Sequence, residues 1–121
     1  KLPSGLLLRY DDLRSTQAER GPEYTYQTRK GRKRIYGAKL IENICQAIAR
    51  CIIAEQMLKI DKRYKTVLTV HDSVLSCVIA EQEQEARAYI EECMRWVPVW
   101  ATGLPINCES GVGVNYGDCE L

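Results

Sequence analysis

The sequence contains no phenylalanine and only one histidine among its 121 residues. Its six cysteines form no CxxC pair, and none stands at zinc-site spacing from the histidine. No stretch approaches the roughly 20 apolar residues of a membrane helix, and no signal peptide opens the chain. These absences argue against a zinc domain, a secreted protein and a membrane protein, and we expect no membrane partner.

The residues that are present are typical of a globular protein, with 45% hydrophobic and 27% charged side chains. The length predicts a single domain over residues 1–121. The first residue is Lys1 rather than a methionine, so we expect a piece of a longer protein. The net charge is only +1, yet residues 1–60 hold 12 Lys and Arg against 6 Asp and Glu. This basic half favours contact with a polyanion.

The cysteines are spaced as core residues rather than as a disulfide framework. Cys45, Cys51 and Cys93 fall on apolar faces of predicted helices, where a free cysteine behaves as a small hydrophobe. We therefore predict reduced cysteines and a cytoplasmic location, with disulfides as the alternative.

Apolar periodicity and turn residues predict the secondary structure. Residues 38–59 lack Gly and Pro and carry apolar residues every three or four positions, which predicts an amphipathic helix. Two β-branched runs, 67–70 and 74–79, predict a hairpin that turns at His71-Asp72-Ser73. We also expect a strand at 5–10, a loop over the polar stretch that follows and includes Gly21 and Pro22, a hairpin over 23–36 around Gly31, a helix over 81–97 and a strand over 106–116. The order predicts an α+β fold, an antiparallel sheet whose second hairpin packs against two helices.

Asp72 is the first candidate for chemistry, because a carboxylate at a hairpin tip is held rigidly and open to solvent. Mg²⁺ takes such hard oxygen ligands, often only one or two from the protein, in two-metal phosphoryl transfer. His71 beside it could donate a hydrogen bond to a substrate phosphate or sugar. The alternative is that both are ordinary turn residues, since Asp is favoured in turns for its local hydrogen bonds.

Basic and amide side chains earlier in the chain are candidates for binding DNA. Arg32, Lys33, Arg34 and Lys39 belong to a run free of acidic residues from 29 to 41. Three tyrosines, at positions 24, 26 and 36, stand in or just before this run, which suits a phosphate backbone. Asn43 and Gln46 share a helix face and could reach a minor groove. The alternatives are a solvated basic turn and solvent-facing helix residues.

Four segments resemble phage-type family A DNA polymerases. Residues 36–50 (YGAKLIENICQAIAR) resemble the helix before motif C, which typically reads YGGKLxENxxQAxAR. Residues 67–74 (VLTVHDSV) resemble motif C itself, usually VHDE. The segments 100–105 (WATGLP) with 108–111 (CESG), and 2–5 (LPSG), resemble the closing WAPGLP…AEG and the LPSGR that follows the fingers. They stand in the family's order and cover nearly the whole chain.

The resemblance implies the C-terminal part of a polymerase palm, with motif C, acting in template-directed nucleotidyl transfer to a primer 3′-hydroxyl. Asp72 falls on the motif C aspartate, which binds two Mg²⁺ ions together with a motif A aspartate. His71 falls on a histidine near the primer 3′ end, and Gln46 on a glutamine at the minor groove of the terminal base pair. The implied partners are primer–template DNA, dNTP and the remaining polymerase domains (motif A palm, fingers and thumb). The implied setting is the cytoplasm of a bacterial cell, with a phage or prophage origin.

The sequence departs from the family in two respects. Ser73 stands where most members carry glutamate, although single-subunit RNA polymerases carry serine there. Neither the DYSxxELR of motif A nor the RxxxKxxxY of the fingers helix occurs. We therefore expect an enzyme only as part of a full-length polymerase, with this segment inactive alone. The alternatives are a non-catalytic DNA-binding or accessory module from a split or degenerate prophage polymerase gene, and an RNA polymerase palm, against which YGAKLIEN and WATGLP argue.

Overall fold

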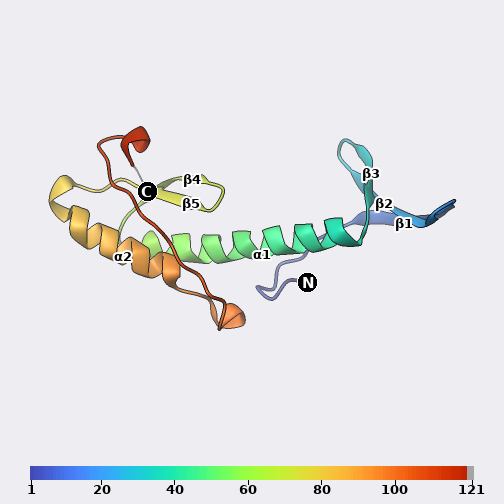
Figure 1. Cartoon of the computed structure of the whole chain (residues 1–121), viewed down its shortest axis with the longest axis horizontal. Helices are drawn as coiled ribbons and strands as arrows, with labels where there is room; N and C mark the ends of the chain where they lie inside the picture. Colours follow the sequence, from blue (N-terminus) through green and yellow to red (C-terminus); the bar gives the residue numbers. More distant parts are fainter. Residues whose placement is uncertain (120–121) are drawn as a thin grey trace. The chain divides into compact units, whose positions relative to one another are not determined.

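The computed structural model describes residues 1–119, in which five strands, two α-helices and three short 3-10 helices form (Figure 1). The chain divides into two compact units, Lys1–Ile48 and a second unit from Ala49 onward. Helix α1 (Gly37–Ile60) contributes residues to both units, which are described separately. The prediction of a single domain stays a prediction.

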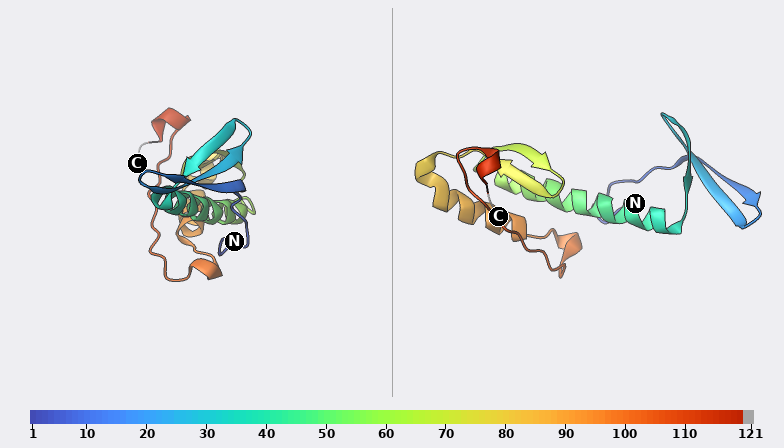
Figure 2. Two further views of the ribbon diagram at one scale, coloured as in Figure 1. Left: turned by 90° about the vertical axis from the view of Figure 1, so that its right-hand side faces the viewer. Right: turned by 45° about the horizontal axis from the view of Figure 1, so that its top comes forward.

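The first unit contains a three-stranded antiparallel sheet in the order β1-β2-β3. Its strands are β1 (Asp11–Ala18), β2 (Gly21–Thr28) and β3 (Gly31–Ile35), and Figure 2 shows them as two successive hairpins. The predicted hairpin over 23–36 is confirmed, with its turn at Arg29 and Lys30. Gly31 has φ +112°, a backbone conformation that residues with a side chain rarely adopt. This explains why a glycine follows the turn.

Two sequence predictions for this unit were wrong. Residues 5–10 form no strand: Gly5 N–H donates to the Leu2 carbonyl at 2.9 Å, and the chain turns there. The polar residues that follow, predicted as a loop, form β1 instead, and Gly21 and Pro22 of that loop begin β2. The side chains of β1 are almost all exposed, so no alternation of apolar and polar residues indicates a strand. Pairing with β2 through the main chain makes it a strand, which composition does not reveal.

Helix α1 confirms the helix predicted over residues 38–59. Four of its residues are buried, all in the second unit: Cys51, Ile52, Gln56 and Ile60. Cys45 was predicted on an apolar face, but its side chain is exposed. The prediction was wrong there because the first turns of α1 bury no residue.

The second unit contains β4 (Thr66–Val70), β5 (Ser73–Ser76), α2 (Glu83–Arg95) and three 3-10 helices, η1 (Ala80–Gln82), η2 (Val99–Ala101) and η3 (Tyr116–Asp118). β4 and β5 form the second predicted hairpin, and α2 lies within the helix predicted over 81–97. The core gathers residues from both helices and β5, namely Ile60, Tyr64, Ala86 and Cys93 with Val74, Val78, Tyr89, Ile90 and Met94. The hairpin therefore packs against two helices, as predicted.

Side chains of α1 hold the segment that leaves α2. The buried Gln56 amide donates to the carbonyls of Met94 at 2.6 Å and Trp96 at 2.9 Å. Trp100 Nε1 donates to the Glu55 carboxylate at 2.8 Å. These contacts give otherwise unpaired carbonyls a partner at the C-terminal end of α2.

The strand predicted over 106–116 does not form. A Cβ atom at Gly113 would lie 2.7 Å from the carbonyl carbon of Asp118, so the chain folds back there instead of extending. Upstream, Arg87 and Arg95 of α2 bind Ser110 and Asn107 through their side chains rather than through a strand ladder. The single predicted sheet is therefore two separate antiparallel sheets within residues 1–119, and the fold is α+β with two helices.

Candidate active-site and DNA-binding residues

The tip of the β4–β5 hairpin is a two-residue turn formed by His71 and Asp72. The strands pair in register up to Val70 opposite Ser73, which leaves only these two residues to connect them. His71 has φ +54°, the left-handed conformation that tight hairpin turns need to match the strand twist. Both side chains are exposed, as expected for residues at a hairpin tip.

Asp72 has no ion pair or hydrogen-bond partner for its carboxylate among residues 1–119. It lines an open groove of about 1230 Å³ within the second unit, together with Ser73. The other walls come from α1, α2 and the segment that includes Gly111 and Tyr116. The groove thus brings together two stretches that carry the sequence resemblance, the hairpin tip and the closing segment.

The fit of this site to Mg²⁺ depends on its donor groups. Asp72 offers one unpartnered carboxylate, the hard oxygen ligand that Mg²⁺ takes. No group of three His, Cys, Asp or Glu side chains within residues 1–119 is placed to hold a metal ion. Asp72 therefore fits the part of a single ligand, and a two-metal site would need further carboxylates from outside this segment.

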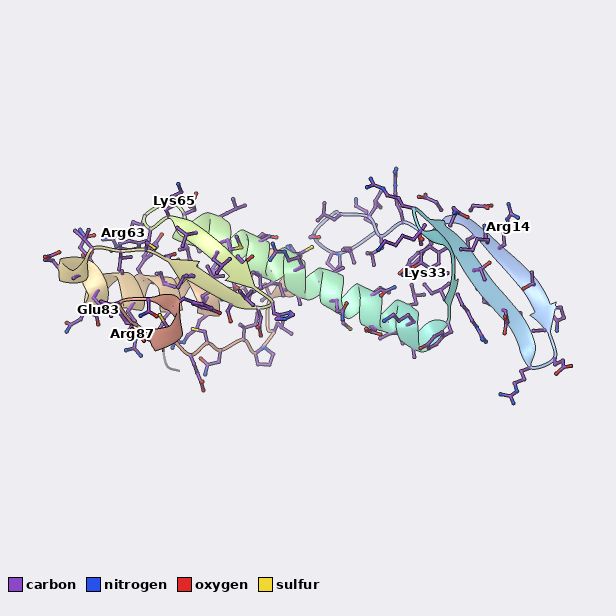
Figure 3. All side chains as sticks on the ribbon, turned by 90° about the horizontal axis from the view of Figure 1, so that it is seen from above. Arg14, Lys33, Arg63, Lys65, Glu83 and Arg87 are labelled. Atoms are coloured by element: carbon purple, nitrogen blue, oxygen red, sulfur yellow. The ribbon has the colours of Figure 1, made fainter. Side chains whose placement is uncertain are left out.

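A polar cluster on α2 was not predicted from the sequence. The Glu91 carboxylate accepts from the Ser110 hydroxyl at 2.5 Å, from Arg95 at 2.9 Å and from Arg87 at 3.3 Å. These donors, Ser110 foremost, lower the pKa of Glu91 to about 2. Arg87, labelled on α2 in Figure 3, also donates to the Ser110 carbonyl at 3.0 Å. The spacing of Arg87, Glu91 and Arg95 at four residues was the available signal.

The two amide candidates lie on α1 in the first unit. Gln46 is exposed, and its Nε2 lies 3.4 Å from the Glu42 carboxylate. Asn43 is half-buried, and its Nδ2 donates to the Tyr10 hydroxyl at 3.1 Å. Gln46 therefore presents the more accessible amide for a minor groove. A common site with Asp72, which belongs to the other unit, stays a prediction.

The basic candidates of the first unit are not equivalent. Arg32 is ion-paired with Asp12 at 2.7 Å and Arg34 with Glu23 at 3.0 Å. Lys39 contacts both carboxylate oxygens of Glu42 at 2.8 Å, and this hydrogen bonding raises the pKa of Lys39. Lys33 has no ion-pair partner among residues 1–119. Of the four predicted cations, three are already engaged by carboxylates.

Comparison with known proteins finds a related sequence. The chain is 37% identical to the "DNA polymerase" of Bacillus phage SP02 over 121 aligned residues, which cover 93% of this chain. This chain is similar to a segment of a phage DNA polymerase. The predicted resemblance to a phage polymerase is thereby confirmed, although the chain spans only 18% of that relative's length. No family model matches the chain, and no solved structure does.

The described residues also bear on the membrane prediction. Neither α1 nor α2, nor any other helix in residues 1–119, is long and apolar enough to cross a bilayer.

Proposed function

We propose that this chain is the C-terminal palm segment of a template-directed DNA polymerase of family A, with motif C at the β4–β5 turn. The observation that carries the proposal is Asp72. It is an exposed, unpartnered carboxylate on a rigid two-residue turn, inside a sequence similar to a phage DNA polymerase. Such a carboxylate is the ligand that two-metal nucleotidyl transfer requires.

In the proposed reaction, the primer 3′-hydroxyl attacks the α-phosphate of a dNTP and pyrophosphate leaves. Bound Mg²⁺ would supply stabilisation of the charge that develops on the phosphate oxygens. Asp72 would be one of its ligands, and the rest of the polymerase (motif A palm, fingers and thumb) would provide the other carboxylates. His71 would lie near the primer terminus, and Gln46 and Asn43 would face the minor groove of the primer–template duplex. The setting would be the cytoplasm of a phage-infected or prophage-bearing bacterium.

Two other functions have a specific observation in their favour. The absence of a group of three metal-ligating side chains within residues 1–119 favours a non-catalytic DNA-binding or accessory module that kept the scaffold. Ser73 favours an RNA polymerase palm, because that class carries serine at this position. A motif A aspartate encoded upstream in the same reading frame would support a polymerase, and ribonucleotide preference in an extension assay would support the RNA polymerase.

The direct experiment is a chimera in which this chain replaces the aligned segment of the Bacillus phage SP02 DNA polymerase. We expect the chimera to extend a primed DNA template with dNTPs, because the segment would supply the motif C ligand. Binding of the chimera to primer–template DNA serves as the control for correct folding. A chimera that binds DNA and extends no primer would favour the non-catalytic module.

A further inference from the structure

The basic residues of the run 29–34 do not all lie on the same face of the sheet. In β3, Arg32 and Arg34 stand opposite Gln27 and Thr25 of β2, whereas Lys33 stands opposite Tyr26. Side chains alternate between the faces of a strand, and directly opposed residues share a face. Arg32 and Arg34 therefore lie on one face and Lys33 on the other.

Arg32 is committed to the sheet itself. Its guanidinium donates to the Asp12 carboxylate and to the Asp12 carbonyl, both at 2.7 Å, and to the Thr25 carbonyl at 3.1 Å. Asp12 has φ +47° and lies where the β1–β2 register shifts, so its carbonyl needs a partner other than a regular strand bond. Arg32 supplies that partner. A phosphate could recruit Arg32 only by breaking these bonds.

Acidic residues neutralise the same face. Arg14 of β1, labelled in Figure 3, also pairs with Asp12 at 2.8 Å, and Arg34 pairs with Glu23 at 3.0 Å. The hydrogen bonds from Arg14 and Arg32 lower the pKa of Asp12, so the carboxylate stays ionised and occupied.

The remaining cations of the run are exposed and have no ion-pair partner among residues 1–119: Arg29, Lys30 and Lys33. Their turn is fixed by two bonds, from the Thr28 hydroxyl to the Gly31 carbonyl at 2.6 Å and from Lys30 N–H to the Thr28 hydroxyl at 3.2 Å. Asp11, in register with Gln27, is the unpaired acid nearest to this turn along the sheet. The turn and the adjoining part of β3 therefore carry three positive charges that are not engaged by carboxylates within residues 1–119: Arg29 and Lys30 in the turn and Lys33 in the strand.

We propose that Arg29, Lys30 and Lys33 form a phosphate-binding strip that contacts the sugar–phosphate backbone of duplex DNA, while Arg32 and Arg34 hold the sheet that carries it. The choice of duplex DNA rests on the proposed polymerase function. The strip binds without reading sequence, because ammonium and guanidinium groups at a turn contact phosphates rather than base edges. Each contact releases a counterion, so the binding weakens steeply as salt rises.

The test compares two double variants of the 121-residue chain that lose the same charge. Lys30→Ala/Lys33→Ala removes two strip cations, and Arg14→Ala/Arg34→Ala removes two ion-paired arginines of the same sheet. Fluorescence anisotropy with a labelled duplex measures the affinity from about 50 to 200 mM salt. Two lost phosphate contacts reduce the slope of log K against log[salt] by about 1.8, so wild-type affinity falls about 12-fold more than that of Lys30→Ala/Lys33→Ala over this range.

The strip is supported if Arg14→Ala/Arg34→Ala keeps the wild-type slope of log K against log[salt]. Equal slopes in the two double variants would overturn it, because net charge alone would then explain the binding. Circular dichroism checks that each variant keeps its sheet, and Lys30→Gln/Lys33→Gln repeats the test with side chains of better matched size. Tighter binding to duplex RNA or to single-stranded DNA than to duplex DNA would also overturn the assignment.

These outcomes are separate from those of the polymerase proposal. If extension by the chimera survives Asp72→Asn while the two double variants still differ, the strip stands and the catalytic proposal fails. If Asp72→Asn abolishes extension while the double variants behave alike, the polymerase proposal stands and the strip fails.

Discussion

Arg32 and Asp12 join two strands that are not neighbours. Arg32 lies on β3 and Asp12 on β1, yet two hydrogen bonds of 2.7 Å connect them across β2. A single side chain thereby ties the outer strands of the sheet together. This contact adds a side-chain link to the main-chain pairing that places the mostly exposed β1 beside β2.

We therefore predict that Arg32→Ala loosens β1 selectively. Hydrogen exchange should show faster exchange of the amides of residues 14–18, with little change in α2. Arg32→Lys should rescue only in part, because one ammonium cannot serve the carboxylate, the Asp12 carbonyl and the Thr25 carbonyl in fixed geometry. Unchanged exchange in β1 of Arg32→Ala would show that main-chain pairing alone holds the strand.

The Glu91 cluster predicts an acid-sensitive contact in the second unit. The pKa of Glu91 is lowered from 4.5 to about 2 in the folded chain, so its stabilising contribution is present above pH 4.5. That contribution is lost as the pH falls from 4.5 towards 2. Glu91→Gln should remove this part of the acid dependence and loosen Ser110 from α2, whereas Glu92→Gln should not. Thermal unfolding measured across this pH range checks it, and matching profiles for the two variants would contradict the role of Glu91.

Gln56 predicts a stability effect of a different kind. Its buried amide donates to the carbonyls of Met94 and Trp96, so Gln56→Ala leaves both without their partner. The expected cost is roughly 0.5–1.5 kcal/mol for each hydrogen bond lost. Gln84→Ala, an exposed change on α2, should stay within about 0.5 kcal/mol of wild type. Urea unfolding measures the stability of both variants, and equal midpoints would refute this role of Gln56.

The cysteines give a chemical prediction. Cys51 and Cys93 are buried in the second unit, and burial raises the pKa of the Cys108 thiol. We expect six free thiols when the chain is denatured without reductant, since none of the spacings suggested a disulfide framework. A titration that finds four or fewer would contradict this.

Periodic patterns and turn residues predicted both α-helices and the hairpins β2–β3 and β4–β5, whereas β1 was missed. The apolar repeat of α1 and the β-branched runs around His71-Asp72-Ser73 gave a helix and a hairpin that the structure confirms. β1 was missed because its side chains face water, and strand pairing is a relation between segments. The segment 106–116 resembled a strand by composition, yet the close approach of Gly113 to Asp118 folds it back.

The candidate site residues were likewise predictable from the sequence only in part. Asp72 could be placed at a turn from local sequence, because valines on either side define the strands. The split among the basic residues could not be predicted, since the partner of Arg32 is 20 positions away at Asp12. The folded sheet of β1, β2 and β3 is needed to show which cations form ion pairs.

Primer extension by the chimera carrying Asp72→Asn tests the central claim most directly. The amide keeps the shape of the side chain but removes the charge that a divalent metal requires. Asp61→Asn is the matched control, because Asp61 lies in the same unit, and its Oδ1 accepts from Thr66 N–H at 3.2 Å, a bond that an amide oxygen can also accept. At saturating DNA and dNTP, we predict that Asp72→Asn nearly abolishes extension while DNA binding is retained, and that Asp61→Asn extends normally. Equal extension rates for Asp72→Asn and the unchanged chimera would show that Asp72 is an ordinary turn residue and would contradict the account.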